Sequence, residues 1–184
     1  MAMVALCLGQ SAWADGTNVL TNPSLPTSNP HQVPGWVFST WIFKDNPGAV
    51  GQVGGKIAVD TDGKNMLTVA STQSLANIQL WWQTLAPLPC AGGSTYELSG
   101  VVKGAIKSGT ARPTIGVYFM DATGKWLGFQ ALPSDAVQAD WQKFDGKVTV
   151  PENAATMGVR LGVVYSDGDA EISFKEPTLQ RAGP

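Results

Sequence analysis

The chain has 184 residues, a length that fits one domain of ordinary size. Only 14% of them are charged and the formal net charge is −2, so there is no cluster of Lys and Arg that could neutralise a nucleic-acid backbone. Beyond the N-terminal segment the sequence contains no cationic amphipathic helix and no apolar run long enough to span a bilayer. We therefore expect neither nucleic-acid binding nor membrane insertion.

The first fourteen residues are typical of the end of a secretory signal peptide. An apolar run over residues 1–8 leads to Ala12-Trp13-Ala14, the small-x-small pattern of a cleavage site before Asp15. The usual basic n-region is missing, which indicates a truncated start or a start codon further upstream; the alternative is an apolar tail. We expect a signal peptide over 1–14 and a secreted or periplasmic domain over 15–184. That domain keeps Cys90 as its one cysteine, so no internal disulfide is expected.

Turn residues recur about every ten positions between short alternating apolar segments, a rhythm typical of sandwiches and barrels. The sequence therefore predicts an all-β fold, a jelly-roll β-sandwich of two antiparallel sheets. In chain order the expected strands are 19–25, 36–43, 56–60, 66–70, 78–85, 96–103, 114–121, 126–132, 144–150, 158–166 and 171–179. Asp-Gly turns at 62–63 and 167–168 and a longer turn at 121–124 are expected to join hairpins.

Successive side chains of a strand point to opposite faces of the sheet, so their parity separates core from open face. In the strand 78–85, Leu80 and Trp82 are expected in the core. The other face carries Trp81 between the amide side chains of Gln79 and Gln83. By the same parity, the strand 114–121 presents Tyr118 outward beside Gly116. The strand 158–166 presents Arg160 outward between Gly158 and Gly162. Repeated glycine on one face indicates the close approach of a ligand or another backbone.

These outward residues suit a sugar, if their strands are neighbours. Aromatic rings stack on the apolar faces of pyranoses, and amide and guanidinium groups bind hydroxyls in a largely preformed site. Trp41 and Trp126 lie near strand ends, where either could rim the cleft or shield the sheet edge. The expected ligand-binding residues are Gln79, Trp81, Gln83, Tyr118, Arg160, Trp41 and Trp126. The alternative is an aromatic face that covers a second layer or a neighbouring chain.

Several motifs, in their order and spacing, resemble the jelly-roll carbohydrate-binding modules of families four, nine and twenty-two, which have a galactose-binding-like sandwich. Residues 19–25 are similar to the opening N-L-N-x-S-F-E, Gly35-Trp36 to G-W, 62–69 to D-G-x-x-x-L-x-V and 93–104 to G-x-T-Y-x-L-S-x-x-V-K-G. The resemblance covers most of the chain and implies a concave sheet that grips a polysaccharide. It also places Trp36 and Trp141 at framework positions, where they are expected in the core.

The same family often holds a structural calcium, with an acidic residue after the first strand and an acidic pair in the last. Here Leu25-Pro26 stands at the first position, and Phe174-Lys175-Glu176-Pro177 stands where F-D-D-V is usual. Glu176 is then the one carboxylate kept as a candidate metal ligand, so the calcium site of the family is only partly present in this sequence. No cofactor is expected to be required.

The leading hypothesis is a secreted, non-catalytic protein that binds a poly- or oligosaccharide. One alternative is a polysaccharide lyase or glycoside hydrolase on the same scaffold, with Tyr118 as proton donor. Another is a structural or adhesive module whose aromatic face meets another protein. The sequence contains a single histidine, His31, so neither a multi-histidine zinc site nor a Ser-His-Asp arrangement is indicated.

Overall fold

The computed structural model describes residues 16–20, 24–25, 33–40, 53–71, 78–108, 112–134, 137–166 and 169–183. Their regular structure consists entirely of strands: β1 (Trp36–Thr40), β2 (Val53–Val59), β3 (Asn65–Ser71), β4 (Ile78–Thr84), β5 (Leu88–Pro89), β6 (Thr95–Ile106), β7 (Arg112–Met120), β8 (Trp126–Ala131), β9 (Gln142–Thr149), β10 (Thr156–Ser166) and β11 (Ala170–Arg181). Among these residues no helix could cross a membrane.

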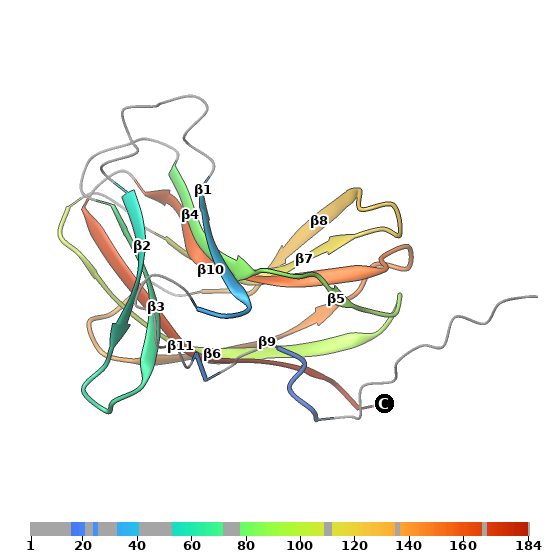
Figure 1. The fold of residues 1–184 in the computed structure, drawn as a ribbon, viewed down its shortest axis with the longest axis horizontal. Coiled ribbons are helices and arrows are strands. Elements are labelled where there is room, and N and C mark those ends of the chain that lie inside the picture. Colours follow the sequence, from blue (N-terminus) through green and yellow to red (C-terminus); the bar gives the residue numbers. More distant parts are fainter. Residues whose placement is uncertain are drawn as a thin grey trace, which may run out of the picture.

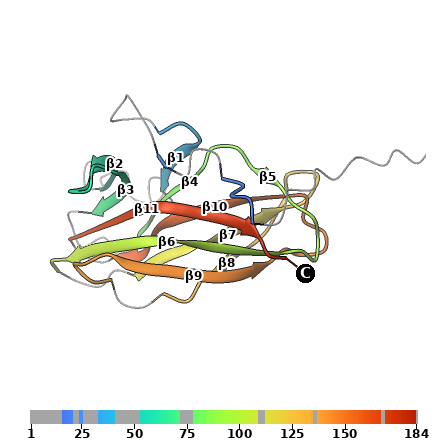
Figure 2. The ribbon, with the colours of Figure 1, turned by 90° about the horizontal axis from the view of Figure 1, so that it is seen from below.

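Two antiparallel sheets pack face to face and confirm the expected jelly-roll β-sandwich. The first has the order β1-β4-β10-β7-β8, with β5 also paired to β10, and the second has the order β2-β3-β11-β6-β9. In Figure 1 the strands around β10 form the upper layer and β6, β9 and β11 the lower one. Figure 2 shows this second layer from below.

Within the described residues the expected strands match observed ones, with two differences, at the N-terminus and at β5. The described part of 19–25 is not a strand; Asn18 forms only an isolated bridge with Gln180. One reason is local, because Leu25 has a φ of 55°, a left-handed conformation that ends an extended segment. The short strand β5 was missed because it contains a proline, which marks an edge rather than a central strand.

The core lies between the sheets and follows the expected parity. Ile115 and Val117 of β7 and Leu161 of β10 are fully buried, as is Phe174 of the facing sheet. Trp82 is 4% exposed, and its indole Nε1 donates a hydrogen bond to the Thr68 carbonyl, 3.0 Å away in the other sheet. Because the inward residues are committed to the core, the alternate residues of β4, β7 and β10 lie on the open face of the first sheet.

Candidate functional site

The register of the first sheet brings the predicted outward residues together. β10 lies between β4 and β7, and directly opposite residues of neighbouring strands share a face. Arg160 of β10 lies opposite Gln83 of β4 on one side and opposite Gly116 of β7 on the other. The tryptophan Trp81 lies opposite Gly162, and Tyr118 lies opposite Gly158.

A groove of about 870 Å³ runs over this face. Gln79 and Trp81 of β4 line one side, Trp126 and Phe129 of β8 line the other, and Arg160 lies between them. β4 and β8 rise on either side of β10 in Figure 1. The volume falls in the range of ligand-binding clefts, about 300–1,000 Å³.

Further groove residues were not predicted from sequence: Ser39, Thr40, Thr114, Phe129 and Ala131. Thr114 has the same parity as Tyr118, so the alternation of β7 could have identified it. Ser39 enters the groove because β1 pairs with β4 and sets it opposite Trp81. That pairing is between distant segments, and no local pattern indicates it. Trp41 lies outside the described residues, and its role stays a prediction.

Arg160 is held by aromatic rings and one amide. Its guanidinium carbon lies 4.4 Å from the centre of the Trp81 ring, 4.9 Å from that of Trp126 and 5.2 Å from that of Tyr118. Its Nε donates a hydrogen bond to Gln83 Oε1 at 3.3 Å, and Trp81 Nε1 donates to the same oxygen at 2.8 Å. Gln83 therefore fixes both the cation and the ring beside it. Burial lowers the pKa of Arg160, but so basic a group stays charged near neutral pH.

The glycines on this face let neighbouring strands come close to β7 and β10. A Cβ atom on Gly158 would lie 2.3 Å from the Tyr118 ring, and one on Gly162 would lie 2.5 Å from Trp81 Cβ. At Gly116 it would lie 2.7 Å from the Phe129 ring. The Tyr118 ring thus fills the space above Gly158, whereas backbone atoms of the neighbouring strand come closest at the other two, the Leu80 carbonyl at Gly162 and the Gln130 carbonyl at Gly116. Of the two expected causes of close approach, another backbone applies at Gly116 and Gly162, and a side chain of the protein itself occupies the space at Gly158.

Tyr118 and Trp126 form a stacked pair with ring centres 5.7 Å apart and an interplanar angle of 14°. Tyr118 is 5% exposed, whereas Trp126 is 47% exposed. The aromatic surface that faces solvent on this side of the groove therefore belongs to Trp126, and Tyr118 supports it from beneath. This burial also leaves the Tyr118 side chain little surface for the proton-donor role of the lyase alternative.

The turn before Trp126 is closed by Asp121, which ends the preceding strand. Its Oδ1 accepts hydrogen bonds from the backbone N–H of Thr123 at 2.8 Å and of Lys125 at 3.0 Å. The Thr123 hydroxyl and these N–H groups lower the pKa of Asp121, because they stabilise its ionised form. Gly124 supplies the left-handed conformation of the turn, with a φ of 82°. The β7–β8 hairpin thus fixes the position at which Trp126 enters the sheet.

The residues at the family's calcium positions do not fit a calcium ion. Glu176 forms an ion pair with Lys64, and the Leu25 carbonyl accepts a hydrogen bond from Asn65 Nδ2 at 2.7 Å. Lys175 replaces one carboxylate of the family's pair by an ammonium group. Among the described residues no group of three or more His, Cys, Asp or Glu side chains could hold a metal. Two oxygens at these positions, Glu176 Oε1 and the Leu25 carbonyl oxygen, thus already contact protein donors.

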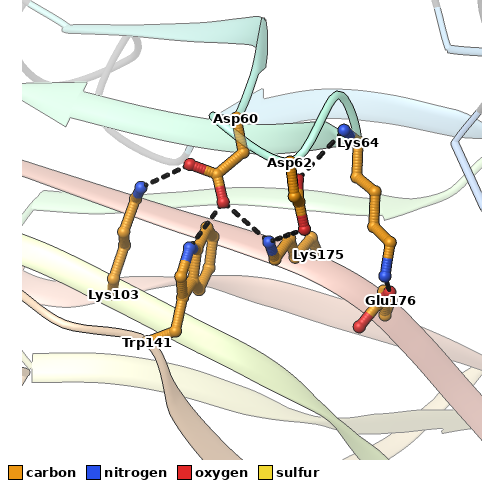
Figure 3. A network of polar contacts seen from close by, with 7 residues as sticks. All are labelled: Asp60, Asp62, Lys64, Lys103, Trp141, Lys175 and Glu176. Atoms are coloured by element: carbon orange, nitrogen blue, oxygen red, sulfur yellow. Dashed lines mark hydrogen bonds and ion pairs between the residues drawn. The ribbon is translucent and has the colours of Figure 1, made fainter.

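Lys175 is the centre of a partly buried ionic cluster on the other sheet (Figure 3). Its Nζ lies 2.6 Å from Asp60 Oδ2 and 2.7 Å from Asp62 Oδ2, and Lys103 Nζ lies 2.9 Å from Asp60 Oδ1. Trp141 Nε1 donates to Asp60 Oδ2 at 2.6 Å. Trp141 is half-buried and lies outside the hydrophobic core, contrary to expectation, because its indole N–H serves this carboxylate.

The charges in the cluster reinforce one another. Hydrogen bonds from Lys175 and Lys103 hold the pKa of Asp60 far below its usual value, and Lys175 lowers the pKa of Asp62. Burial alone would lower the pKa of Lys175, but the hydrogen bonds to Asp60 and Asp62 outweigh it and raise that pKa. All three groups are therefore ionised across the neutral range.

No protein-family model and no curated protein sequence matches this chain. Solved structures match its fold. The C-terminal family 22 carbohydrate-binding module of a Clostridium thermocellum xylanase has a TM-score of 0.56 at 15% identity, covering 89% of this chain and 96% of the module. A family 22 xylan-binding domain from Paenibacillus barcinonensis has a TM-score of 0.53 at 16% identity, covering 82% and 87%.

A larger protein also contains this fold. The enzymatically active domain of tailspike protein 4 from bacteriophage CBA120 has a TM-score of 0.61 at 13% identity, and the match covers 89% of this chain. This chain spans only 21% of the length of that tailspike domain. At these identities the comparisons establish the architecture: the chain has the jelly-roll fold of the carbohydrate-binding modules it was expected to resemble.

Proposed function

We propose that this protein is a non-catalytic carbohydrate-binding protein that takes an oligo- or polysaccharide chain in the groove of its first sheet. The observation that carries the proposal is the groove itself, in which Trp81 and the exposed Trp126 flank Arg160 and Gln79. Trp81 and Trp126 would stack on pyranose faces, while the amide and guanidinium groups would bind hydroxyls. The groove crosses the five strands β1, β4, β10, β7 and β8, which suits a chain of several sugars, and the protein would act outside the cytoplasm.

Two fold neighbours support this function, because both are carbohydrate-binding modules and one is a xylan-binding domain. Each matches over most of its own length, so the likeness concerns a whole module and not a fragment of an enzyme. Among the described groove residues there is no carboxylate, so the lining offers no acid pair for glycoside hydrolysis. We therefore place binding ahead of the lyase and hydrolase alternatives.

The test is a screen of the purified protein against neutral and acidic glycans, followed by titration of each hit with tryptophan fluorescence. We expect saturable binding with a change in emission, because Trp81 and Trp126 line the site. Trp81→Ala should weaken every hit. Val59→Ala is the control, since Val59 is 66% exposed at the end of β2 in the other sheet.

Two outcomes would contradict the proposal. The first is an affinity that Trp81→Ala leaves unchanged for every bound glycan. The second is the absence of any glycan hit together with a dimer in solution whose interface covers Trp126. That result would favour the structural or adhesive alternative, in which the aromatic face meets another protein.

A further inference from the structure

The groove has an unbalanced charge. Its described lining consists of neutral side chains together with Arg160, the single charged residue among them. No described carboxylate lies within ion-pair distance of this guanidinium. The groove as described therefore presents one fixed positive charge without a counter-charge.

This arrangement differs from that of most other described cations, although Arg112, Lys125 and Arg181 also have no described ion pair. Seven described lysines have a carboxylate partner: Lys56, Lys64, Lys103, Lys107, Lys143, Lys147 and Lys175. Several of these pairs are largely exposed, where water alone would solvate the charge at little cost. Arg160, by contrast, is half-buried, and its desolvation is opposed only by aromatic rings and one neutral amide.

The geometry of Arg160 leaves donors free for a ligand. A guanidinium has five N–H groups, and only the Nε–H has a described acceptor, Gln83 Oε1. That oxygen already accepts a second hydrogen bond, from Trp81. The terminal N–H groups remain, and their planar fork matches the two oxygens of an anion. The rings of Trp81 and Trp126, 4.4 Å and 4.9 Å away, hold the fork inside the groove.

We propose that the groove is selective for acidic glycans, with the carboxylate or sulfate group of a sugar bound by Arg160 while its ring lies against Trp81 or Trp126. This inference rests on the proposed function and adds the class of sugar. The selectivity would be local, because the net charge of −2 gives no long-range attraction for an anionic chain. A half-buried ion pair is also screened less by salt than a surface pair.

The test compares each acidic chain with its own neutral form. Oligogalacturonate, oligomannuronate and hyaluronan hexamers are titrated beside their carboxyl-reduced counterparts, which keep the linkage and lose only the charge. Dextran sulfate and dextran form the arm that separates sulfate from carboxylate. We expect at least one acidic chain to bind tenfold or more tightly than its neutral form.

Arg160→Gln should abolish that preference, and Arg160→Lys should keep part of it, because lysine retains the charge but not the planar fork. Thermal melting of both variants checks that they fold; if Arg160→Gln does not fold, the lysine variant and the wild-type comparison still decide. Equal binding of acidic and neutral forms would overturn the inference while leaving the proposed function intact. No binding of any glycan, acidic or neutral, would overturn both.

Discussion

Individual side chains of the groove depend on each other for their positions. Gln83 Oε1 accepts hydrogen bonds from both Trp81 and Arg160, so one neutral oxygen orients a ring and a cation. Tyr118 supports Trp126 by stacking beneath it. The groove is therefore built in two tiers, in which Gln83 and Tyr118 hold the residues that would contact a ligand.

Trp126→Ala should weaken glycan binding roughly thirtyfold, because a large aromatic anchor at a binding site contributes about 2 kcal/mol or more. Stability should change little, since the side chain is 47% exposed. Calorimetric titration of the best glycan and a thermal melt measure the two effects. Unchanged affinity would show that Trp126 shields the sheet edge and takes no part in binding.

Gln83→Leu should lower affinity about tenfold or more, because a hydrogen bond to a charged group contributes about 1.5–3 kcal/mol and Arg160 would lose its orientation. The substitution keeps nearly the same volume. Gln180→Leu, at another half-buried glutamine in the other sheet, is the matched control and should leave affinity unchanged. Equal effects of the two variants would contradict a positioning role for Gln83.

At the level of the strands, the glycines of β7 and β10 decide how close the aromatic rings come to the sheet. Gly158 and Gly162 alternate with core residues of β10. The Tyr118 ring of β7 covers Gly158, and the β4 chain at Leu80 and Trp81 lies against Gly162. A glycine weakens an isolated strand, and here the packed rings compensate for the missing side chain. The glycine at position 158 thus lets the Tyr118 ring lie close to the backbone of β10.

Gly158→Ala should lower the free energy of unfolding by about 1–3 kcal/mol, because the new methyl group would overlap the Tyr118 ring. It should also weaken binding, since displacement of Tyr118 moves the stacked Trp126. Urea denaturation and a glycan titration measure these effects. Gly54→Ala in β2 is the control, because a Cβ there meets nothing within 4 Å. A stable Gly158→Ala variant with full affinity would contradict this packing.

For the molecule as a whole, the ionic cluster ties the β2–β3 turn to β6 and β11. Asp60 and Asp62 come from the turn, Lys103 from β6 and Lys175 from β11 (Figure 3). The protein thus joins segments more than a hundred residues apart by internal ion pairs. The carbohydrate-binding modules that the sequence resembles often hold a structural calcium ion near the corresponding position of the last strand.

Stability should fall in acid. The pKa values of Asp60 and Asp62 are lowered in the folded protein. Their contribution to the free energy of unfolding is therefore fully present at a pH above their unfolded pKa of about 3.8, and it is lost as the pH falls below that value toward the folded pKa. The raised pKa of Lys175 acts at alkaline pH. Its contribution to the free energy of unfolding is present at a pH below the unfolded pKa of 10.5 and is lost as the pH rises through the folded pKa. Urea denaturation from pH 2 to 11 should show a plateau between these limits.

Asp60→Asn should lower the plateau and make the acidic decline shallower, because one carboxylate that must take up a proton is gone. Some decline should remain, since the pKa of Asp121 is lowered as well. Asp145→Asn is the control, as its ion pair with Lys143 is exposed. An unchanged acidic limb in Asp60→Asn would contradict the assigned role of the cluster.

Calcium should not stabilise the protein, because Lys64 and Asn65 hold the oxygens at the family's metal positions. Melting temperatures in excess calcium and in a chelator should agree. A clear rise in calcium that Glu176→Gln abolishes would show that a metal ion displaces Lys64 from this carboxylate.

The sequence by itself determined the all-β class, most of the strands and which side chains of each strand face outward. These follow from the two-residue alternation and from turn residues, which are local properties of the chain. The parity of β4, β7 and β10 correctly separated the core residues Leu80, Val117 and Leu161 from Trp81, Tyr118 and Arg160.

Only the tertiary structure decided which strands are neighbours. That choice put Arg160 between Trp81 and Trp126, placed the Tyr118 ring over Gly158 and buried Tyr118 beneath Trp126. It also paired Lys175 with Asp60, 115 residues away in sequence. The physical reason is that parity fixes the face of a side chain, whereas its neighbours depend on strand order and register, which are set by packing over the whole chain.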